Sequence, residues 1–138
     1  MEAYVHKVQY YETDRMGITH HSNYIRWMEE ARIDYLERCG WSYEKLEAEG
    51  IISPVLSVNC KYKESTTFAD MIQIVTSVKA FNGVRLTIEY KMYKDIVKNP
   101  ICIGVSEHCF LDKSGVPIRL KKDFPDFHQV LTQLAEKE

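Results

Sequence analysis

Apolar side chains recur every three or four positions between Tyr24 and Cys39, which is the spacing of one face of an α-helix. Charged residues take most of the positions between them, so this helix is expected to pack one side against a broad apolar surface. Gly40 follows at the position where a glycine commonly ends a helix, and a shorter polar helix is predicted from Trp41 to Glu49. The apolar face consists of Tyr24, Trp27, Met28, Ala31, Tyr35, Leu36 and Cys39.

The spacing changes from helical to alternating after Pro54, which predicts β-strands. The first of these alternates apolar and polar residues and is expected to be half-buried. The Asn82-Gly83 pair favours a tight hairpin, because both residues tolerate positive φ, so the strands on either side of it are predicted to be antiparallel neighbours. A last short helix is expected near Pro125. Strands are predicted at 4–11, 56–63, 71–81, 84–93 and 101–111.

This order of elements predicts an α+β domain spanning residues 1–138, in which an antiparallel sheet covers the long helix. The composition is that of an ordinary globular protein, with 45% hydrophobic and 28% charged residues. A net charge of -2 gives no field that would attract nucleic acid or an anionic membrane. No apolar run approaches the ~18 residues that a membrane span requires. The four cysteines form no C-x-x-C pair and lie within apolar or strand-like runs, which indicates reduced core thiols and predicts a cytoplasmic protein.

Residues 11–24 carry the most chemical information, because an aspartate and a glycine precede the start of the predicted helix. The segment reads Tyr-Glu-Thr-Asp-Arg-Met-Gly-Ile-Thr-His-His-Ser-Asn-Tyr. A carboxylate here can act as a base or a nucleophile, and free N–H groups at a helix start can hold the negative oxygen of an attacked carbonyl. The aspartate could instead close an Asx turn or cap the helix.

The motif resembles that of the acyl-CoA thioesterases of the hotdog-fold superfamily, within it most closely the 4-hydroxybenzoyl-CoA thioesterase and YbgC-like branch. The resemblance rests on Asp14 followed by Gly17, His21 and Tyr24, and the order of elements agrees with it from about Tyr4 to about Phe127. It implies a hotdog fold, a five-stranded antiparallel sheet wrapped around a long central helix. It also implies hydrolysis of an acyl-CoA thioester to a free acid and coenzyme A.

The resemblance assigns roles to the residues of the motif. Asp14 is the predicted general base or nucleophile, two routes that the sequence leaves open. Gly17 is expected to let the backbone turn tightly toward the thioester, and the main-chain N–H of His21 to polarise the thioester carbonyl. Tyr24 is a predicted wall of the acyl pocket, its alternative being an ordinary core aromatic. Ser22 is predicted to cap the helix.

Coenzyme A carries phosphates, so cationic side chains are expected near the site. For each candidate the alternative is an ordinary exposed cation. No cofactor is expected, because coenzyme A enters as part of the substrate. No metal site is predicted either, since the adjacent His20 and His21 point in different directions at a helix start. The cationic candidates are Arg85, Lys91, Arg119, Lys121 and Lys122, of which Arg85, Lys91 and Arg119 are the predicted substrate-binding set.

Hotdog subunits that resemble this chain pair through their sheets and build each active site from two chains. A homodimer or homotetramer with active sites at the subunit interfaces is therefore expected. Two other functions stay open, a hotdog-fold enoyl-CoA hydratase or dehydratase and a non-catalytic acyl-CoA binding or sensor module. The acid ahead of the helix argues against the first, and retention of Asp14 argues against the second. Ala69 stands where members of the family often have a glycine, so the turn at 67–70 is not carried over from the resemblance.

Overall fold

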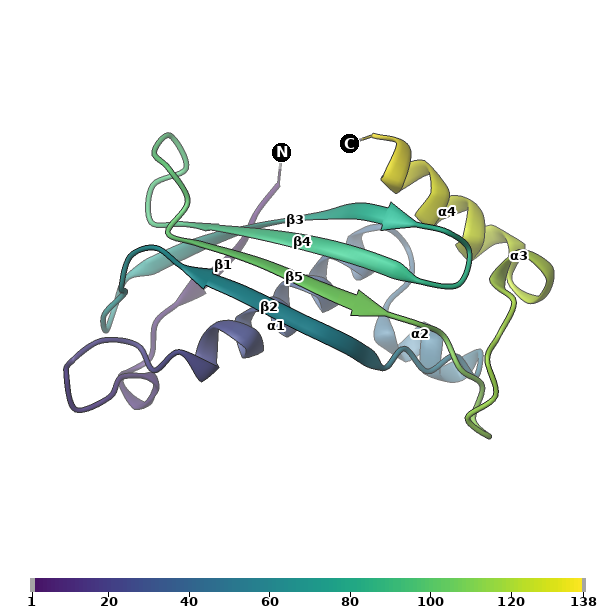
Figure 1. Ribbon diagram of the computed structural model, residues 1–138, viewed down its shortest axis with the longest axis horizontal. Coiled ribbons are helices and arrows are strands. Elements are labelled where there is room, and N and C mark those ends of the chain that lie inside the picture. Colours follow the sequence, from purple (N-terminus) through teal and green to yellow (C-terminus); the bar gives the residue numbers. More distant parts are fainter. Residues whose placement is uncertain (1, 138) are drawn as a thin grey trace.

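The computed structural model describes residues 2–137 and consists of a five-stranded antiparallel sheet packed on a long helix (Figure 1). The predicted α+β class and the predicted sheet around a central helix are confirmed. The strands lie in the order β1-β3-β4-β5-β2. No helix among residues 2–137 combines the length and apolar character needed to cross a membrane. The strands are β1 (Tyr4–Lys7), β2 (Val55–Tyr62), β3 (Met71–Phe81), β4 (Leu86–Tyr93) and β5 (Cys102–His108), and the helices are η1 (Tyr10–Glu12), α1 (Ser22–Arg38), α2 (Tyr43–Ala48), α3 (Leu120–Asp123) and α4 (Pro125–Glu136).

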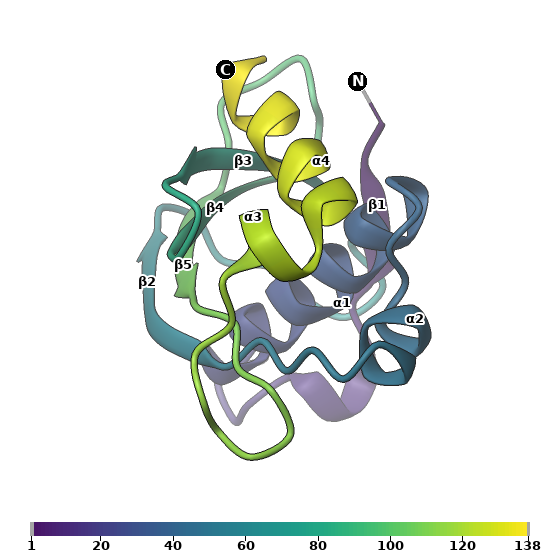
Figure 2. The same cartoon turned by 90° about the vertical axis from the view of Figure 1, so that its right-hand side faces the viewer.

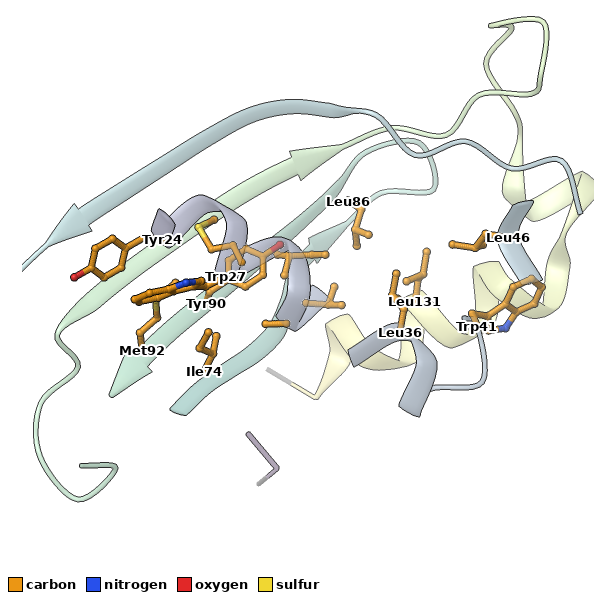
Figure 3. Packing of buried hydrophobic residues seen from close by; sticks show 14 of the residues in the cluster. Tyr24, Trp27, Leu36, Trp41, Leu46, Ile74, Leu86, Tyr90, Met92 and Leu131 are labelled. Atoms are coloured by element: carbon orange, nitrogen blue, oxygen red, sulfur yellow. The ribbon is translucent and has the colours of Figure 1, made fainter. Parts of the chain in front are cut away.

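Helix α1 buries the apolar face that its sequence predicts. Trp27 and Ala31 are fully buried, and the core continues into Ile74 of β3 and Met92 of β4 (Figure 3). Burying a large apolar side chain of this kind contributes about 1.5–3 kcal/mol, so the face as a whole ties α1 to the sheet. The helix ends before Gly40, whose φ of 89° lies in the left-handed region.

The sheet and α1 approach closely where Met28 lies against Gly104 of β5. A Cβ atom at Gly104 would lie 2.7 Å from the Met28 sulfur, well inside contact distance. The absent side chain at position 104 therefore provides the space that the Met28 thioether occupies.

The predicted hairpin is confirmed by the register of β3 and β4, in which Phe81 pairs with Leu86. Asn82 Oδ1 accepts hydrogen bonds from the N–H groups of Val84 and Arg85 at 2.9 and 2.7 Å, which closes the turn. The predicted helix at Pro125 is also present. The short helix α3, which the sequence pattern did not predict, precedes it, and Figure 2 shows the two helices together at one end of the sheet.

The prediction of a half-buried strand after Pro54 is wrong for the single chain, because β2 is exposed along nearly its whole length. It is the last strand of the sheet and pairs only with β5, so its other edge has no strand beside it among residues 2–137. Val55, Leu56, Val58 and Tyr62 are 45%, 47%, 38% and 46% exposed.

Candidate functional site

A closed loop at residues 13–19 carries Asp14 toward the start of α1. Thr13 and Thr19 face each other as an isolated antiparallel bridge. Inside the loop, the Asp14 N–H donates to the Ile18 carbonyl at 2.8 Å, and the Gly17 N–H donates to the Asp14 carbonyl at 3.0 Å. Gly17 has a φ of 82°, a conformation that side chains oppose, which explains the need for glycine at this turn. The loop is thus closed by its own backbone.

The Asp14 side chain is half-buried and makes one local hydrogen bond. Its Oδ1 accepts from the Met16 N–H at 2.9 Å, which is the Asx turn considered above as an alternative to catalysis. The second carboxylate oxygen, Oδ2, accepts no hydrogen bond within the part of the chain that the structure describes. The turn therefore orients the carboxylate and leaves one oxygen available for chemistry.

Helix α1 begins at Ser22 with His21 in the N-cap position, close to the predicted start. The next two N–H groups are occupied: Ser22 donates to His20 Nδ1 at 3.3 Å and Asn23 donates to the His20 carbonyl at 3.0 Å. For the His21 N–H, by contrast, residues 2–137 provide no acceptor. This free donor at the positive end of a helix dipole suits a developing oxyanion.

The prediction that Ser22 caps the helix is wrong. Ser22 is the first helical residue, and its hydroxyl lies 2.8 Å from His20 Nδ1. The imidazole of His20 takes the cap's place, because its ring nitrogen receives the Ser22 N–H. The His20 and His21 rings stack with centroids 4.4 Å apart. Among residues 2–137 no group of three or more histidine, cysteine, aspartate or glutamate side chains is arranged to hold a metal ion.

A cavity of about 280 Å³ opens beside this helix start. Its two large walls are Tyr24 and Tyr62, whose ring centroids lie 5.1 Å apart with the rings edge to face. The hydroxyl of Tyr62 donates to the His21 carbonyl at 3.2 Å. Asp14 belongs to the adjoining loop and not to the cavity wall. The lining residues are Ile18, Thr19, His21, Tyr24, Tyr62, Lys63, Glu64 and Ser65.

The loop at 63–70 holds the cavity wall and the motif loop together. Thr66 is 1% exposed, and its carbonyl oxygen accepts a hydrogen bond from the Thr19 N–H at 2.9 Å. Its hydroxyl lies 2.6 Å from the Thr19 hydroxyl and 3.0 Å from the Tyr24 hydroxyl. Thr67 donates from its hydroxyl to the Gly17 carbonyl at 2.8 Å. Burial raises the pKa of Tyr24, so its hydroxyl remains neutral in this network.

The turn at 67–70 is formed even though alanine replaces the glycine of the family pattern. Ala69 has a φ of 73°, the one left-handed residue other than glycine in residues 2–137. The Asp70 N–H donates to the Thr67 carbonyl at 3.1 Å, and Asp70 Oδ2 accepts the Thr67 N–H at 2.9 Å. These bonds, with the Ala69 N–H donated to Val8 at 3.0 Å, hold the strained residue in place.

One chain brings Asp14, Gly17, His21 and Tyr24 to the start of α1 but leaves the predicted cationic set elsewhere. Arg85 lies in the β3–β4 hairpin, at the opposite end of the sheet from that helix start (Figure 1), 3.8 Å from Glu107. Lys91 is exposed on β4, 3.9 Å from Glu89, and Arg119 is exposed just before α3. Since none of the three lines the cavity, their role in substrate binding stays a prediction.

Lys63 is the cation that lines the cavity, and the sequence pattern did not single it out. The sequence pattern did not single out Tyr62 or Thr66 as site residues either. A strand end and a polar loop carry no local sign of which residues face a helix about 40 positions away. Glu12 lies inside the motif, and the structure buries it. The sequence does not reveal this burial, because a charged residue between Tyr11 and Thr13 carries no local sign of being buried.

Comparison with known proteins gives a consistent result for sequence and structure. The model of the thioesterase-like superfamily matches residues 8–133. YneP of Bacillus subtilis (strain 168), provisionally named an acyl-CoA thioesterase, is 34% identical over 122 residues, which are 88% of each chain. The acyl-CoA thioester hydrolase YbgC of Escherichia coli O6:H1 is 27% identical over 62% of this chain and 64% of its own. The solved DHNA-CoA thioesterase from Staphylococcus aureus superposes with a TM-score of 0.90 at 32% identity, covering 98% of this chain and 91% of that one.

Proposed function

The chain belongs to the thioesterase-like superfamily, and from this we propose that it hydrolyses acyl-CoA thioesters to a free acid and coenzyme A. The observation that carries the proposal is that one motif, residues 14–21 ahead of α1, holds two polar groups without a partner among residues 2–137. Asp14 keeps one carboxylate oxygen without a partner in the described chain, and the His21 N–H lacks an acceptor there as well. The names of the relatives support the same chemistry.

In the proposed reaction the thioester carbonyl oxygen accepts the His21 N–H, which stabilises the negative charge formed on attack. In one route Asp14 takes a proton from water, the water oxygen bonds to the carbonyl carbon, and the C–S bond then breaks. The proton passes to the departing thiolate. In the other route Asp14 itself bonds to the carbonyl carbon and expels the thiolate, and water hydrolyses the resulting anhydride.

We place the acyl group in the cavity beside Tyr24 and Tyr62, since both rings line it at the helix start. Aromatic walls favour flat aromatic acyl groups, and one solved relative is named a DHNA-CoA thioesterase. Lys63 would then meet the coenzyme A phosphates. The absence of a cofactor and the cytoplasmic location stay predictions.

We also propose that two chains pair along β2. An exposed edge strand with apolar side chains invites a second strand, and antiparallel pairing about a twofold axis would extend the sheet and cover it. Such a dimer, or a tetramer built from two, could bring Arg85, Lys91 or Arg119 of a second copy toward the cavity.

Thiol release tests the proposed activity directly. The purified protein is incubated with aliphatic acyl-CoA species of graded length and with aromatic ones, and free thiol is followed with time. The native protein is expected to release thiol, and Asp14→Asn, which keeps the shape of the side chain, to lower the rate by roughly 10³-fold or more. Asp112→Asn is the matched control, because Asp112 closes a similar Asx turn far from the site, accepting from Ser114 at 2.8 Å.

Other outcomes distinguish the alternatives. Thiol release that survives Asp14→Asn would overturn the mechanism while leaving the activity. Tight binding of acyl-CoA without release would identify a sensor, and reversible addition of water to an enoyl-CoA would identify a hydratase.

A further inference from the structure

Glu12 is a buried carboxylate that the proposed chemistry does not use. It is 4% exposed and lies at the end of η1, two residues before Asp14. Its Oε1 accepts the Gln9 N–H at 2.8 Å and lies 2.8 Å from His6 Nε2. Its Oε2 accepts the indole N–H of Trp27, also at 2.8 Å. The side chain therefore joins β1, η1 and α1 at one point.

The backbone of Glu12 makes a second set of contacts, with the start of α1. Its carbonyl oxygen accepts the His20 N–H and the Asn23 side-chain N–H, each at 2.9 Å. His20 immediately precedes His21, and Asn23 lies in the first turn of α1. One residue thus holds both the segment that leads to Asp14 and the segment that presents the His21 N–H.

Glu12 is itself held as an ionised acceptor. His6 lies between two carboxylates, with its Nδ1 3.1 Å from Glu30 Oε1, and its ring packs on Trp27 with centroids 4.6 Å apart. Burial alone would raise the pKa of Glu12, but the hydrogen bonds that it accepts outweigh burial and lower the pKa below its usual range.

We propose that Glu12 is a positioning residue, whose carboxylate and carbonyl set Asp14 and the His21 N–H in the relative geometry that thioester hydrolysis needs. The inference rests on the proposed function. Glu12 touches neither the cavity nor the reacting atoms, so it acts through Asp14 and His21. A displacement of about 1 Å between reacting groups can lower turnover on the order of 10²-fold.

Glu12→Gln tests this assignment, because glutamine keeps the size but turns an NH₂ group toward at least one of the donors. We expect kcat to fall roughly 10- to 100-fold while KM changes less than about twofold, since Tyr24 and Tyr62 still form the cavity. Ser106→Ala is the matched control. It removes a buried hydroxyl that lies 2.7 Å from Tyr90, away from the site, and kcat should stay within about twofold of the native value.

Trp27→Phe provides a second variant should Glu12→Gln not fold, because it removes the indole donor, together with part of a buried ring, and leaves the Glu12 carboxylate in place. Its kcat is expected to fall roughly three- to tenfold. All variants are assayed below the temperature at which unfolding begins, as judged by circular dichroism. An unchanged kcat in the folded Glu12 and Trp27 variants would overturn the proposal, as would an equal loss in Ser106→Ala or a rise in KM alone.

Amide hydrogen exchange makes the test independent of activity. In Glu12→Gln, or in Trp27→Phe, exchange at residues 13–21 is expected to accelerate about tenfold or more while exchange in β4 is unchanged. If the native protein releases thiol from no acyl-CoA, the proposed function fails, yet this measurement still reports whether Glu12 orders the motif. Unaltered exchange at 13–21 would refute the positioning role even in an active thioesterase.

Discussion

The hydroxyl oxygen of Tyr24 lies 3.0 Å from Oγ1 of Thr66, a contact that joins the first turn of α1 to a loop 42 residues further along the chain. The same Oγ1 lies 2.6 Å from the hydroxyl of Thr19. A single threonine hydroxyl therefore connects the wall of the cavity to the end of the motif loop, and both of its partners are buried.

Thr66→Val should destabilise the fold by about 1–3 kcal/mol, because the isosteric side chain leaves the buried hydroxyls of Tyr24 and Thr19 without their shared partner. Denaturant unfolding followed by circular dichroism measures the change. Thr67→Val is the control: it removes one exposed bond, to the Gly17 carbonyl, and should cost less than about 1 kcal/mol. Equal losses of stability in the two variants would show that the buried hydrogen-bond network of Thr66 contributes no more than the exposed bond of Thr67.

Ala69→Gly should stabilise the protein by about 0.5–1 kcal/mol. The φ of 73° at Ala69 costs an L-residue with a Cβ roughly 1–2 kcal/mol, part of which is offset by the greater freedom of glycine in the unfolded chain. Thermal or denaturant unfolding gives the difference. The same change at Ala80, an exposed position in β3 without positive φ, should instead destabilise. A loss of stability in Ala69→Gly would mean that the turn is not strained.

Val58→Lys should weaken self-association if two chains pair along β2. The charge would lie on the exposed edge strand, where a second strand is expected, and lysine on such an edge opposes pairing. Sedimentation velocity at several concentrations measures the effect. Val84→Lys places the same charge in the exposed β3–β4 turn and should leave the association state unchanged. A monomeric native protein would rule out the dimer itself.

His108 should make the protein less stable in mild acid. Burial, followed by the nearby charge of Arg32, lowers its pKa from 6.5 to about 4, so the folded state holds it neutral. Its Nε2 lies 2.7 Å from the Ser106 hydroxyl, while Nδ1 is buried without a partner in residues 2–137. The unfolded chain binds the proton first, and the stability that neutral His108 contributes is present above pH 6.5 and lost as the pH falls toward about 4.

His108→Gln checks this assignment, because glutamine does not titrate. Urea unfolding at pH 7.5, 6.0, 5.0 and about 4.5 should show a smaller decline in the variant than in the native protein. Glu12, whose pKa is lowered, loses its contribution only below its unfolded pKa and does so in both proteins. Parallel pH profiles for the two proteins would contradict the prediction.

The sequence predicts those features of the fold that a local signal marks. The face of α1 and the β3–β4 hairpin were predicted because helical spacing and an Asn-Gly pair are local signals that burial reinforces. The alternating pattern of β2 was equally clear, yet its burial was misjudged. Alternation predicts a strand but does not say whether that strand lies at the edge of the sheet.

The site prediction extends only as far as one continuous motif, and it does not include the residues that distant segments bring to the cavity. Asp14, Gly17 and His21 lie within eight consecutive residues, whereas Tyr62 and Lys63 line the cavity from a distant segment. Thr66, from the same segment, contacts the Tyr24 wall through its hydroxyl. Arg32 shows the same limit. Its guanidinium lies on the helix that the pattern identified, but its partners, the hydroxyls of Tyr43 and Tyr90 at 3.0 and 3.1 Å, come from other elements.

Gly104 has a consequence for the helix start that none of the site residues reveals. The nearest atom that an added Cβ would meet belongs to Met28, less than two turns along the helix from His21. A larger residue at 104 would clash with that thioether and displace the first turns of α1 away from β5. The backbone hydrogen bonds that close the loop of Asp14 would be unaffected. We therefore expect a substitution on β5, a strand that contributes no residue to the cavity lining, to change the distance between Asp14 and the His21 N–H.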